Sequence, residues 1–405
     1  MHTLVINPGY PVEVSHFTRA LAQVGGRVLG IGDTPPGALA PEVRHVLADY
    51  LHVRSLWDEA AVLDALRTWP AARALDRVES LWEPAMMLAA RIREAFGLPG
   101  MSCATTNLFR DKEAMKAALD RAGIRTPRHR RAGSESEIRA AAEAIGYPLI
   151  VKPIAGAGSA DTHRVDDPEA LERCLRAVRH VAEVSVEEFI EGDEFTYDTI
   201  CGGGRILFRN VSWYRPRPLE QRTLEWVSPQ TIALRRLDHA ELAGGVEMGP
   251  RVLTALGFES GFTHMEWFRK PDGEAVFGEI GARPPGARST DIMNFCCDGD
   301  VYTAWAEAVT YGRVSQPMER RWNAAIVFKR AAGAGRITRI EGLGRWLARY
   351  GRNVVSVDLL PVGAPRRNWK QTLLSDGWVV VRHPELQATL EIADRFGTDV
   401  RMYAE

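Results

Sequence analysis

The chain has 405 residues, of which 45% are hydrophobic and 25% are charged. This composition is ordinary for a folded globular protein and excludes a disordered one, and the length indicates two to four domains. Lys and Arg number 51 and Asp and Glu 52, so the formal net charge is −1 and no bulk positive field would draw the chain to nucleic acid or to an anionic membrane. Any polyanion that it binds must be held by a local site.

The cysteines and the apolar runs exclude further classes of protein. The five cysteines include no C-x-x-C pair, which argues against a zinc ribbon or a thioredoxin-type centre. An odd number in a chain of this length fits a reducing compartment better than a disulfide framework. The N-terminus has no basic stretch followed by an apolar core, and no apolar run approaches the ~20 residues that span a bilayer. We therefore expect a cytoplasmic protein.

The first hundred residues alternate between strand and helix patterns. A short apolar run over residues 3–6 is followed by an amphipathic stretch from Val14 to Val24 and by a second apolar run over residues 27–31. Leu98-Pro99-Gly100 then breaks the pattern. We predict an open α/β domain over residues 1–102.

The next segment begins with helices that have clear starts. Asp111 can cap one helix, and Ser134 with Glu137 has the spacing of a capping box. Further along, the sequence predicts a strand over residues 148–153, a helix over residues 168–182 and a strand over residues 184–190.

Two hairpins and a strand-rich end complete the chain. The first hairpin is predicted from Phe195 to Trp213 and the second from Gly261 to Gly281. From about Trp322 the chain has short strands, with a last helix near residues 385–396. We predict a small β-rich lobe over residues 316–405.

The second hairpin predicts a pair of facing carboxylates. If Asp272 and Gly273 form a two-residue loop, Glu266 lies opposite Glu279, and strand alternation puts His264 on the same face. Like charges that face each other are destabilising, and a bound divalent cation with oxygen ligands, such as Mg²⁺, would compensate. Two alternatives stay open: both glutamates are solvated surface residues, or the loop is longer and the register differs.

An arginine follows this pair in a Gly- and Pro-rich loop. Arg283 stands four residues beyond Glu279, where it can bridge from a cation to a developing oxyanion. A hairpin carboxylate followed by such a loop resembles the ATP-grasp superfamily, especially its carboxylate–amine ligases and biotin-carboxylase-like members. The resemblance is most specific over residues 110–286. It implies a multidomain α/β and α+β chain, in which an ATP-grasp domain over residues 103–315, with halves at about 103–190 and 191–315, lies between the leading domain and the C-terminal lobe.

The resemblance also implies a set of nucleotide and metal residues. Lys112 and Lys152 match the two nucleotide lysines, and a lysine inside a proline-bounded apolar strand needs a partner for its charge in any case. Glu266 and Glu279 match the magnesium carboxylates, and Arg283 matches the arginine near the transferred phosphate. The remaining matches are Gly156, Gly158 and Ser159 in the phosphate loop, Glu187, Glu188, Phe189 and Ile190 in the hinge that reads adenine, and Glu194 for the ribose.

One position departs from the pattern, and others are candidates for the substrate. Many relatives have an Asn as a further metal ligand where this chain has Gly281, which leaves open a weakened or lost activity. Arg288 and Arg217 are candidates for an acidic substrate, because arginine forks suit carboxylates; the segment around Arg217 can equally be a solvent-exposed basic loop. His264 either contacts substrate or supports Glu266.

The function that the resemblance implies is ATP-dependent ligation of a carboxylate to an amine, with ATP and Mg²⁺ (or Mn²⁺) as cofactors and release of ADP and phosphate. The expected partners are small-molecule acids and amines such as amino acids, and a homodimer is a further expectation. Two alternatives remain: a bicarbonate-activating carboxylase that uses a separate biotin carrier, and a non-catalytic nucleotide-binding module.

Overall fold

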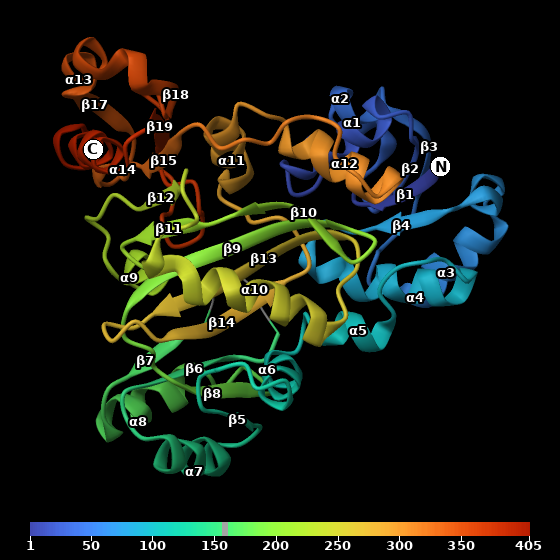
Figure 1. The fold of residues 1–405 in the computed structure, drawn as a ribbon, viewed down its shortest axis with the longest axis horizontal. Coiled ribbons are helices and arrows are strands. Elements are labelled where there is room, and N and C mark those ends of the chain that lie inside the picture. The colour runs from blue at the N-terminus through green and yellow to red at the C-terminus, as the bar shows by residue number, and fades with distance from the viewer. Residues whose placement is uncertain (156–160) are drawn as a thin grey trace.

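The computed structural model describes residues 1–155 and 161–405, and Figure 1 shows their arrangement. The leading unit is a parallel sheet with strand order β3-β2-β1-β4, as the alternating strand and helix patterns predict. Its strands are β1 (His2–Ile6), β2 (Arg27–Gly32), β3 (Leu47–His52) and β4 (Arg77–Glu79). Its helices are α1 (Val14–Gln23), α2 (Pro41–Arg44), α3 (Glu59–Thr68) and α4 (Met86–Phe96), and α5 (Cys103–Asn107) leads out of it.

A four-stranded antiparallel sheet follows, with strand order β5-β8-β6-β7. Asp111 caps α6 as predicted, since its carboxylate accepts hydrogen bonds from the Glu113 and Ala114 amides at 3.0 and 2.9 Å. The elements are β5 (His129–Ala132), β6 (Leu149–Pro153), β7 (His163–Val165), β8 (Val184–Glu188), α6 (Lys112–Arg121), α7 (Glu135–Ile145) and α8 (Pro168–Ala177). Helices α7 and α8 bury their apolar stripes against this sheet, at the bottom of Figure 1.

The largest sheet has nine strands in the order β14-β13-β9-β11-β12-β15-β19-β18, with β10 paired to β9. Its strands are β9 (Asp193–Gly202), β10 (Arg205–Asn210), β11 (Ser212–Arg215), β12 (Gln230–Ala233), β13 (Gly261–Arg269), β14 (Ala275–Gly281), β15 (Asn323–Phe328), β18 (Val354–Leu359) and β19 (Gly377–His383). Because β12 pairs with β15, the segment after residue 316 continues the sheet of the preceding segment.

The remaining elements surround this sheet. A small sheet contains β16 (Ala332–Gly333), β17 (Ile337–Glu341) and β20 (Arg401–Ala404). The helices are α9 (Pro218–Thr223), α10 (Ala243–Leu256), α11 (Ser289–Cys297), α12 (Val301–Tyr311), α13 (Leu343–Tyr350) and α14 (Leu386–Asp399). The C-terminal segment therefore contains two helices, one more than the sequence predicts.

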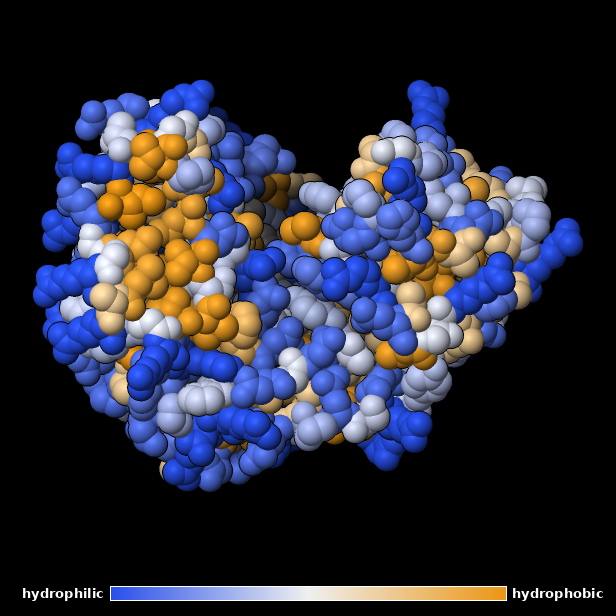
Figure 2. All heavy atoms as spheres, turned by 90° about the horizontal axis from the view of Figure 1, so that it is seen from above, coloured by the Kyte–Doolittle hydropathy of each residue, from blue (hydrophilic) through white to orange (hydrophobic). Residues whose placement is uncertain are grey.

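The molecular surface is uneven in polarity. Seen from above, hydrophobic side chains gather on the left of Figure 2, which is the side of the C-terminal segment in Figure 1. The edge strand β18 belongs to that segment, and its Val357 is 39% exposed. Within the described ranges, no helix has both the length and the apolar character needed to cross a membrane.

Helix α10 covers one face of the large sheet at very close range. A Cβ on Gly245 would lie 2.1 Å from the Trp267 ring, and one on Gly249 would lie 2.3 Å from the Tyr197 ring. These two glycines therefore let α10 seat directly on aromatic side chains of β13 and β9. Since side chains alternate along a strand, the neighbours of those aromatics point to the other face.

The hairpin β13–β14 pairs Glu266 with Glu279, as predicted, but the predicted two-residue loop is wrong. The Lys270 amide donates to the Glu274 carbonyl at 2.9 Å, so the loop has three residues, 271–273, and shifts the register by one. A bulge at Gly278 then shifts the register back before Glu279 is reached. A Cβ there would lie 2.8 Å from the Glu266 carbonyl oxygen, which explains the glycine.

We predict that Gly278→Val destabilises the hairpin. The added side chain must displace the Glu266 backbone, and overpacking of this kind costs about 1–3 kcal/mol. Chemical denaturation of both proteins measures the difference in free energy of unfolding. The control is Gly344→Ala in α13, where an added Cβ meets nothing within 4 Å and stability should hold or rise. Equal stability of Gly278→Val and the parent chain would contradict the bulge argument.

Candidate active site

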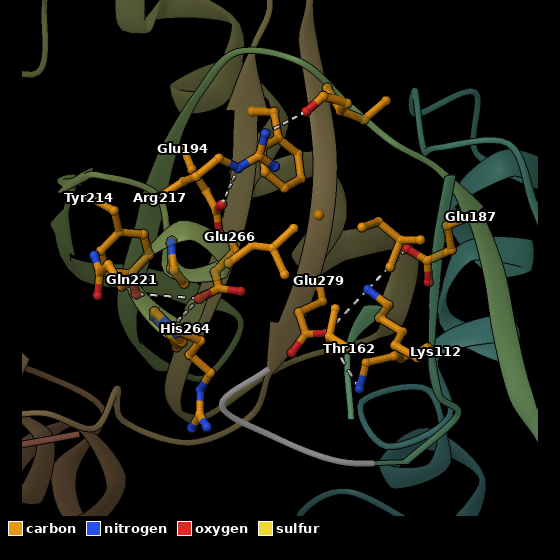
Figure 3. Close-up of a pocket in the computed structure, with 18 of the residues that line it drawn as sticks. Lys112, Thr162, Glu187, Glu194, Tyr214, Arg217, Gln221, His264, Glu266 and Glu279 are labelled. Carbon is orange, nitrogen blue, oxygen red and sulfur yellow. Dashed lines mark hydrogen bonds and ion pairs between the residues drawn. The ribbon is translucent and has the colours of Figure 1, made fainter. Parts of the chain in front are cut away.

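A cleft of about 230 Å³ lies between the β5–β8 sheet and the large sheet (Figure 3). Most of the residues that the sequence singles out line it, although they come from elements far apart in the chain. They are Lys112, Lys152, Glu187, Glu188, Phe189, Ile190, Glu194, Arg217, His264, Glu266, Glu279 and Arg283. The fold thus gathers cations and carboxylates from both sheets into one concave space.

The paired carboxylates stand on one wall of this cleft. The Glu266 and Glu279 side chains are 25% and 27% exposed, so their oxygens are accessible from the cleft. The Tyr214 hydroxyl donates a hydrogen bond to Glu266 Oε1 at 3.3 Å, and Lys112 Nζ lies 3.4 Å from Glu279 Oε2. Burial alone would raise the pKa of Glu279, but Lys112 and Lys152 outweigh it and lower that pKa to about 2. Neighbouring cations therefore keep Glu279 ionised.

A buried ion network fixes Lys152, the residue predicted to be the second nucleotide lysine. Glu187 binds Lys116 Nζ through Oε1 at 2.5 Å and Lys152 Nζ through Oε2 at 3.0 Å. Burial opposes the charge on Glu187, yet the two lysines lower its pKa. For Lys116, which is completely buried, burial prevails and lowers the pKa in spite of Glu187. Glu187 is thus engaged by lysines, and its position orients Lys152 towards Glu279, 3.7 Å away.

His264 links Glu266 to a buried aspartate. Its Nδ1 lies 2.6 Å from Asp198 Oδ1, and its Nε2 lies 3.4 Å from Glu266 Oε1. Burial would lower the pKa of this imidazole, but Asp198 and Glu266 together raise it to about 9. With this raised pKa the ring is positively charged at neutral pH, and its charge lies beside Glu266.

Arg283 is held by a residue of the leading unit. Its Nε donates to Glu83 Oε2 at 2.7 Å, and the other oxygen of Glu83 accepts from Arg110. Glu83 is 8% exposed, so both arginines share a buried carboxylate. Although burial would lower the pKa of Arg283, Glu83 raises it, and the guanidinium stays charged beside the Glu266–Glu279 pair.

The hinge end of the cleft contains Arg217. Its Nη1 donates to the Ile190 carbonyl at 2.8 Å, and its guanidinium lies 4.8 Å from the ring centres of both Phe189 and Phe268. Arg217 Nε is 3.5 Å from Glu194 Oε2. Burial, reinforced by Glu266, nevertheless raises the pKa of Glu194 to about 8. Arg217 therefore lies beside Phe189 and Ile190, two of the residues predicted to form the hinge.

Other predicted residues lie elsewhere. Arg288 does not line the cleft; its Nε is 2.7 Å from Asp291, and its guanidinium lies over Trp378. Gly156, Gly158 and Ser159 are outside the described residues. Gly281, the departure from the family pattern, pairs with His264, and a Cβ there would lie 3.4 Å from Arg283 Cγ. A larger side chain at that position would therefore crowd Arg283.

Sequence reasoning missed four side chains that organise the cleft: Lys116, Glu83, Asp198 and Tyr214. A signal existed for Lys116, which follows Lys112 by four residues on the stripe of α6 that contains Met115 and Leu119. Asp198 lies on the predicted first hairpin and Tyr214 directly follows it, and alternation along these strands could have placed both on the cleft face. Glu83 comes from another unit and carried no local signal.

The cleft suits a nucleotide with its metal. Over residues 1–155 and 161–405 no three His, Cys, Asp or Glu side chains gather as a metal-binding cluster. Two carboxylates that leave room for phosphate oxygens and water are, however, the donor set that Mg²⁺ commonly takes. Glu266 and Glu279 would hold the ion, Lys112 and Lys152 the phosphates, and Glu194 with the hinge backbone the nucleoside. The donor chemistry of the site therefore fits both groups.

Comparisons with known proteins agree with this geometry. Residues 109–212 match the family described as ATP-grasp domain. The L-arginine-specific L-amino acid ligase of Bacillus subtilis is 28% identical over 235 residues, covering 56% of this chain and 55% of the ligase. The chain spans about half the length of the curated relatives that it matches first.

Solved structures extend the likeness to the whole chain. An L-amino acid ligase from Bacillus licheniformis superposes with a TM-score of 0.77 at 22% identity, covering 100% of this chain and 98% of that one. N5-carboxyaminoimidazole ribonucleotide synthetase from Thermotoga maritima gives a TM-score of 0.72 at 19% identity, covering 100% and 99%. The protein therefore has the multidomain ATP-grasp fold. The family match itself covers residues 109–212, within that fold.

We predict that Glu187→Gln strongly destabilises the chain, because it leaves Lys116 and Lys152 without their shared counter-charge. Removing one partner of a buried ion pair costs about 3–5 kcal/mol. Denaturant unfolding measures this change. The control is the adjacent Glu188→Gln, which faces the more exposed Arg125 and should cost below about 1 kcal/mol. Similar losses in both variants would contradict the special role of Glu187.

We also predict that stability falls as pH rises because of Glu194. The folded chain keeps a proton on this carboxyl up to about pH 8, whereas the unfolded chain loses it near 4.5. The folded state thus binds more protons in that window, and its stability decreases with pH. Glu194→Gln should gain in Tm relative to the parent chain between pH 5 and 9, while the exposed Glu191→Gln should not. A difference in Tm that is constant with pH would refute the raised pKa.

Proposed function

We propose that the chain is an ATP-dependent ligase that joins the carboxylate of one small molecule to the amine of another, with amino acids as the substrate class. The observation that carries this proposal is the single cleft in which Lys112, Lys152 and Arg283 stand around the paired carboxylates Glu266 and Glu279. Similarity to the L-arginine-specific L-amino acid ligase supports the choice of amino acids.

In the first half-reaction a carboxylate oxygen of the acid attacks the γ-phosphorus of ATP. The bond from that phosphorus to the β,γ-bridging oxygen breaks, giving an acylphosphate and ADP. Lys112 and Lys152 would hold the phosphates in line for this attack, since phosphoryl transfer depends mainly on positioning and charge neutralisation. Mg²⁺ or Mn²⁺ on Glu266 and Glu279 would supply further neutralisation of phosphate charge.

In the second half-reaction the amine nitrogen attacks the acyl carbon. The amide C–N bond forms, the bond from the acyl carbon to the phosphate oxygen breaks with its electron pair going to phosphate, and the nitrogen loses a proton to water or to the departing phosphate. Arg283, which Glu83 fixes by a 2.7 Å hydrogen bond, would stabilise the negative oxygen of the tetrahedral intermediate. Because Asp198 and Glu266 raise the pKa of His264 to about 9, this imidazole would keep Glu266 in place instead of accepting the proton.

The proposal includes the cellular compartment of the reaction and the partners of the chain. We place it in the cytoplasm, since ATP is found there and the five cysteines are all free thiols. Small-molecule substrates remain the proposed partners, and a homodimer stays a prediction.

The experiment that tests the function is a screen for ADP and phosphate release. Purified chain with ATP and Mg²⁺ is incubated with pools of amino acids, with and without a second amine, and with bicarbonate as a separate arm. Amine-dependent ADP release with an amide product supports the ligase. Release that needs bicarbonate and biotin would favour a carboxylase, and ATP binding without turnover in any pool would favour a binding module.

We predict that Glu279→Gln lowers ADP release by at least about 100-fold, because it removes one of the two carboxylates that would hold the metal. The fold should be retained, as judged by circular dichroism. Glu274→Gln on the same hairpin is the control, since its side chain is 40% exposed and pairs with Lys270 away from the cleft. Turnover of Glu279→Gln near the parent rate would exclude the metal role.

A further inference from the structure

A second hollow, of about 470 Å³, lies on the opposite face of the large sheet. Three strands contribute to both sites through adjacent residues. β9 presents Glu194 to the cleft and Phe195 to the hollow, and β11 presents Tyr214 to the cleft and Trp213 to the hollow. Likewise, β13 presents Phe268 to the cleft and Arg269 to the hollow, because side chains alternate along a strand. The hollow and the cleft are therefore separate sites on opposite faces of the sheet, lined by residues that are adjacent in sequence.

The inner surface of the hollow is apolar and aromatic. Phe195, Leu234 and Leu242 are each at most 4% exposed, and the partly exposed Trp213 ring stacks on Phe195 at 6.0 Å with an interplanar angle of 19°. Leu386, at the start of α14, adds a further apolar side chain. The volume lies within the range of small-molecule sites, and the lining suits a planar ring.

Among the residues that the structure describes, one arginine at the rim, Arg235, forms no ion pair with a carboxylate. Arg269 pairs with Asp193 and Glu241, and Arg236 pairs with Asp238. Arg235, in contrast, has no carboxylate within ion-pair distance anywhere in the described ranges, and its Nη1 reaches a carbonyl, that of Pro384, at 3.4 Å. A guanidinium at an apolar rim is an effective binder of a carboxylate.

We propose that this hollow binds a small molecule in which an aromatic ring carries a carboxylate. The ring would pack against the partly exposed Trp213 side chain, and the carboxylate would pair with Arg235. This site is independent of the proposed ligase function, since neither residue lines the nucleotide cleft. Aromatic amino acids and simple aromatic acids share this chemistry.

The test uses the full chain and isothermal titration with three probes: indole-3-acetate, L-tryptophan and neutral indole. At least one of the two carboxylates should bind about tenfold more tightly than indole, the gain expected from one charge-assisted hydrogen bond. The tighter of the two indicates whether a simple acid or an amino acid is preferred. Saturating ATP with Mg²⁺ should not displace the probe. No carboxylate binding, or displacement by ATP, would overturn the proposal.

Variants assign the binding to the hollow. Arg235→Gln should reduce carboxylate affinity to that of indole, whereas the neighbouring Arg236→Gln, which loses an exposed pair with Asp238, should change it less than twofold. Gln387→Trp, at an exposed rim position, should fill the hollow and abolish binding without removing a described contact. Equal effects of the two arginine variants, or full binding by Gln387→Trp, would refute the site. Thermal melting confirms that each variant is folded.

Discussion

The repulsion between Glu266 and Glu279 is the constraint around which the cleft is built. Two carboxylates directly opposite on neighbouring strands are unfavourable unless positive charge surrounds them. The chain supplies that charge from three directions: protonated His264 beside Glu266, Lys112 and Lys152 beside Glu279, and Arg283 from the following loop. Three of these cations are in turn paired with a further carboxylate: His264 with Asp198, Lys152 with Glu187 and Arg283 with Glu83. The cations of the cleft therefore compensate one unfavourable contact, that between Glu266 and Glu279, and further carboxylates hold three of those cations in place.

Local pattern was enough to predict this contact, although part of the reasoning was wrong. A two-residue loop was expected at Asp272-Gly273, and the structure has a three-residue loop compensated by the Gly278 bulge. The longer loop and the bulge shift the register in opposite directions, so Glu266 faces Glu279 both in the prediction and in the structure. Helix starts at Asp111 and Ser134 were also predictable, because a cap is a contact between residues two or three positions apart.

What sequence could not reveal was the set of contacts made between units. Glu83 reaches Arg283 across 200 positions, and Glu187 meets Lys116 across 71, so no window of sequence contains both partners. The continuation of the large sheet through β15 was likewise hidden, because strand order is set by tertiary packing and not by the strands' own residues. The partners of Glu187 and Arg217 were hidden for the same reason, since each partner comes from another element.

The Glu83 contact has a consequence for how such a chain could change over evolutionary time. One carboxylate from the leading unit balances two arginines, Arg110 and Arg283, that belong to the next unit. Exchange of the leading unit by recombination would leave both guanidiniums without their shared counter-charge, unless the incoming unit carried an acid at the same place. The two units are therefore expected to be inherited together because of this single side chain. Substitution of one of the two arginines would still leave the other in need of the Glu83 carboxylate.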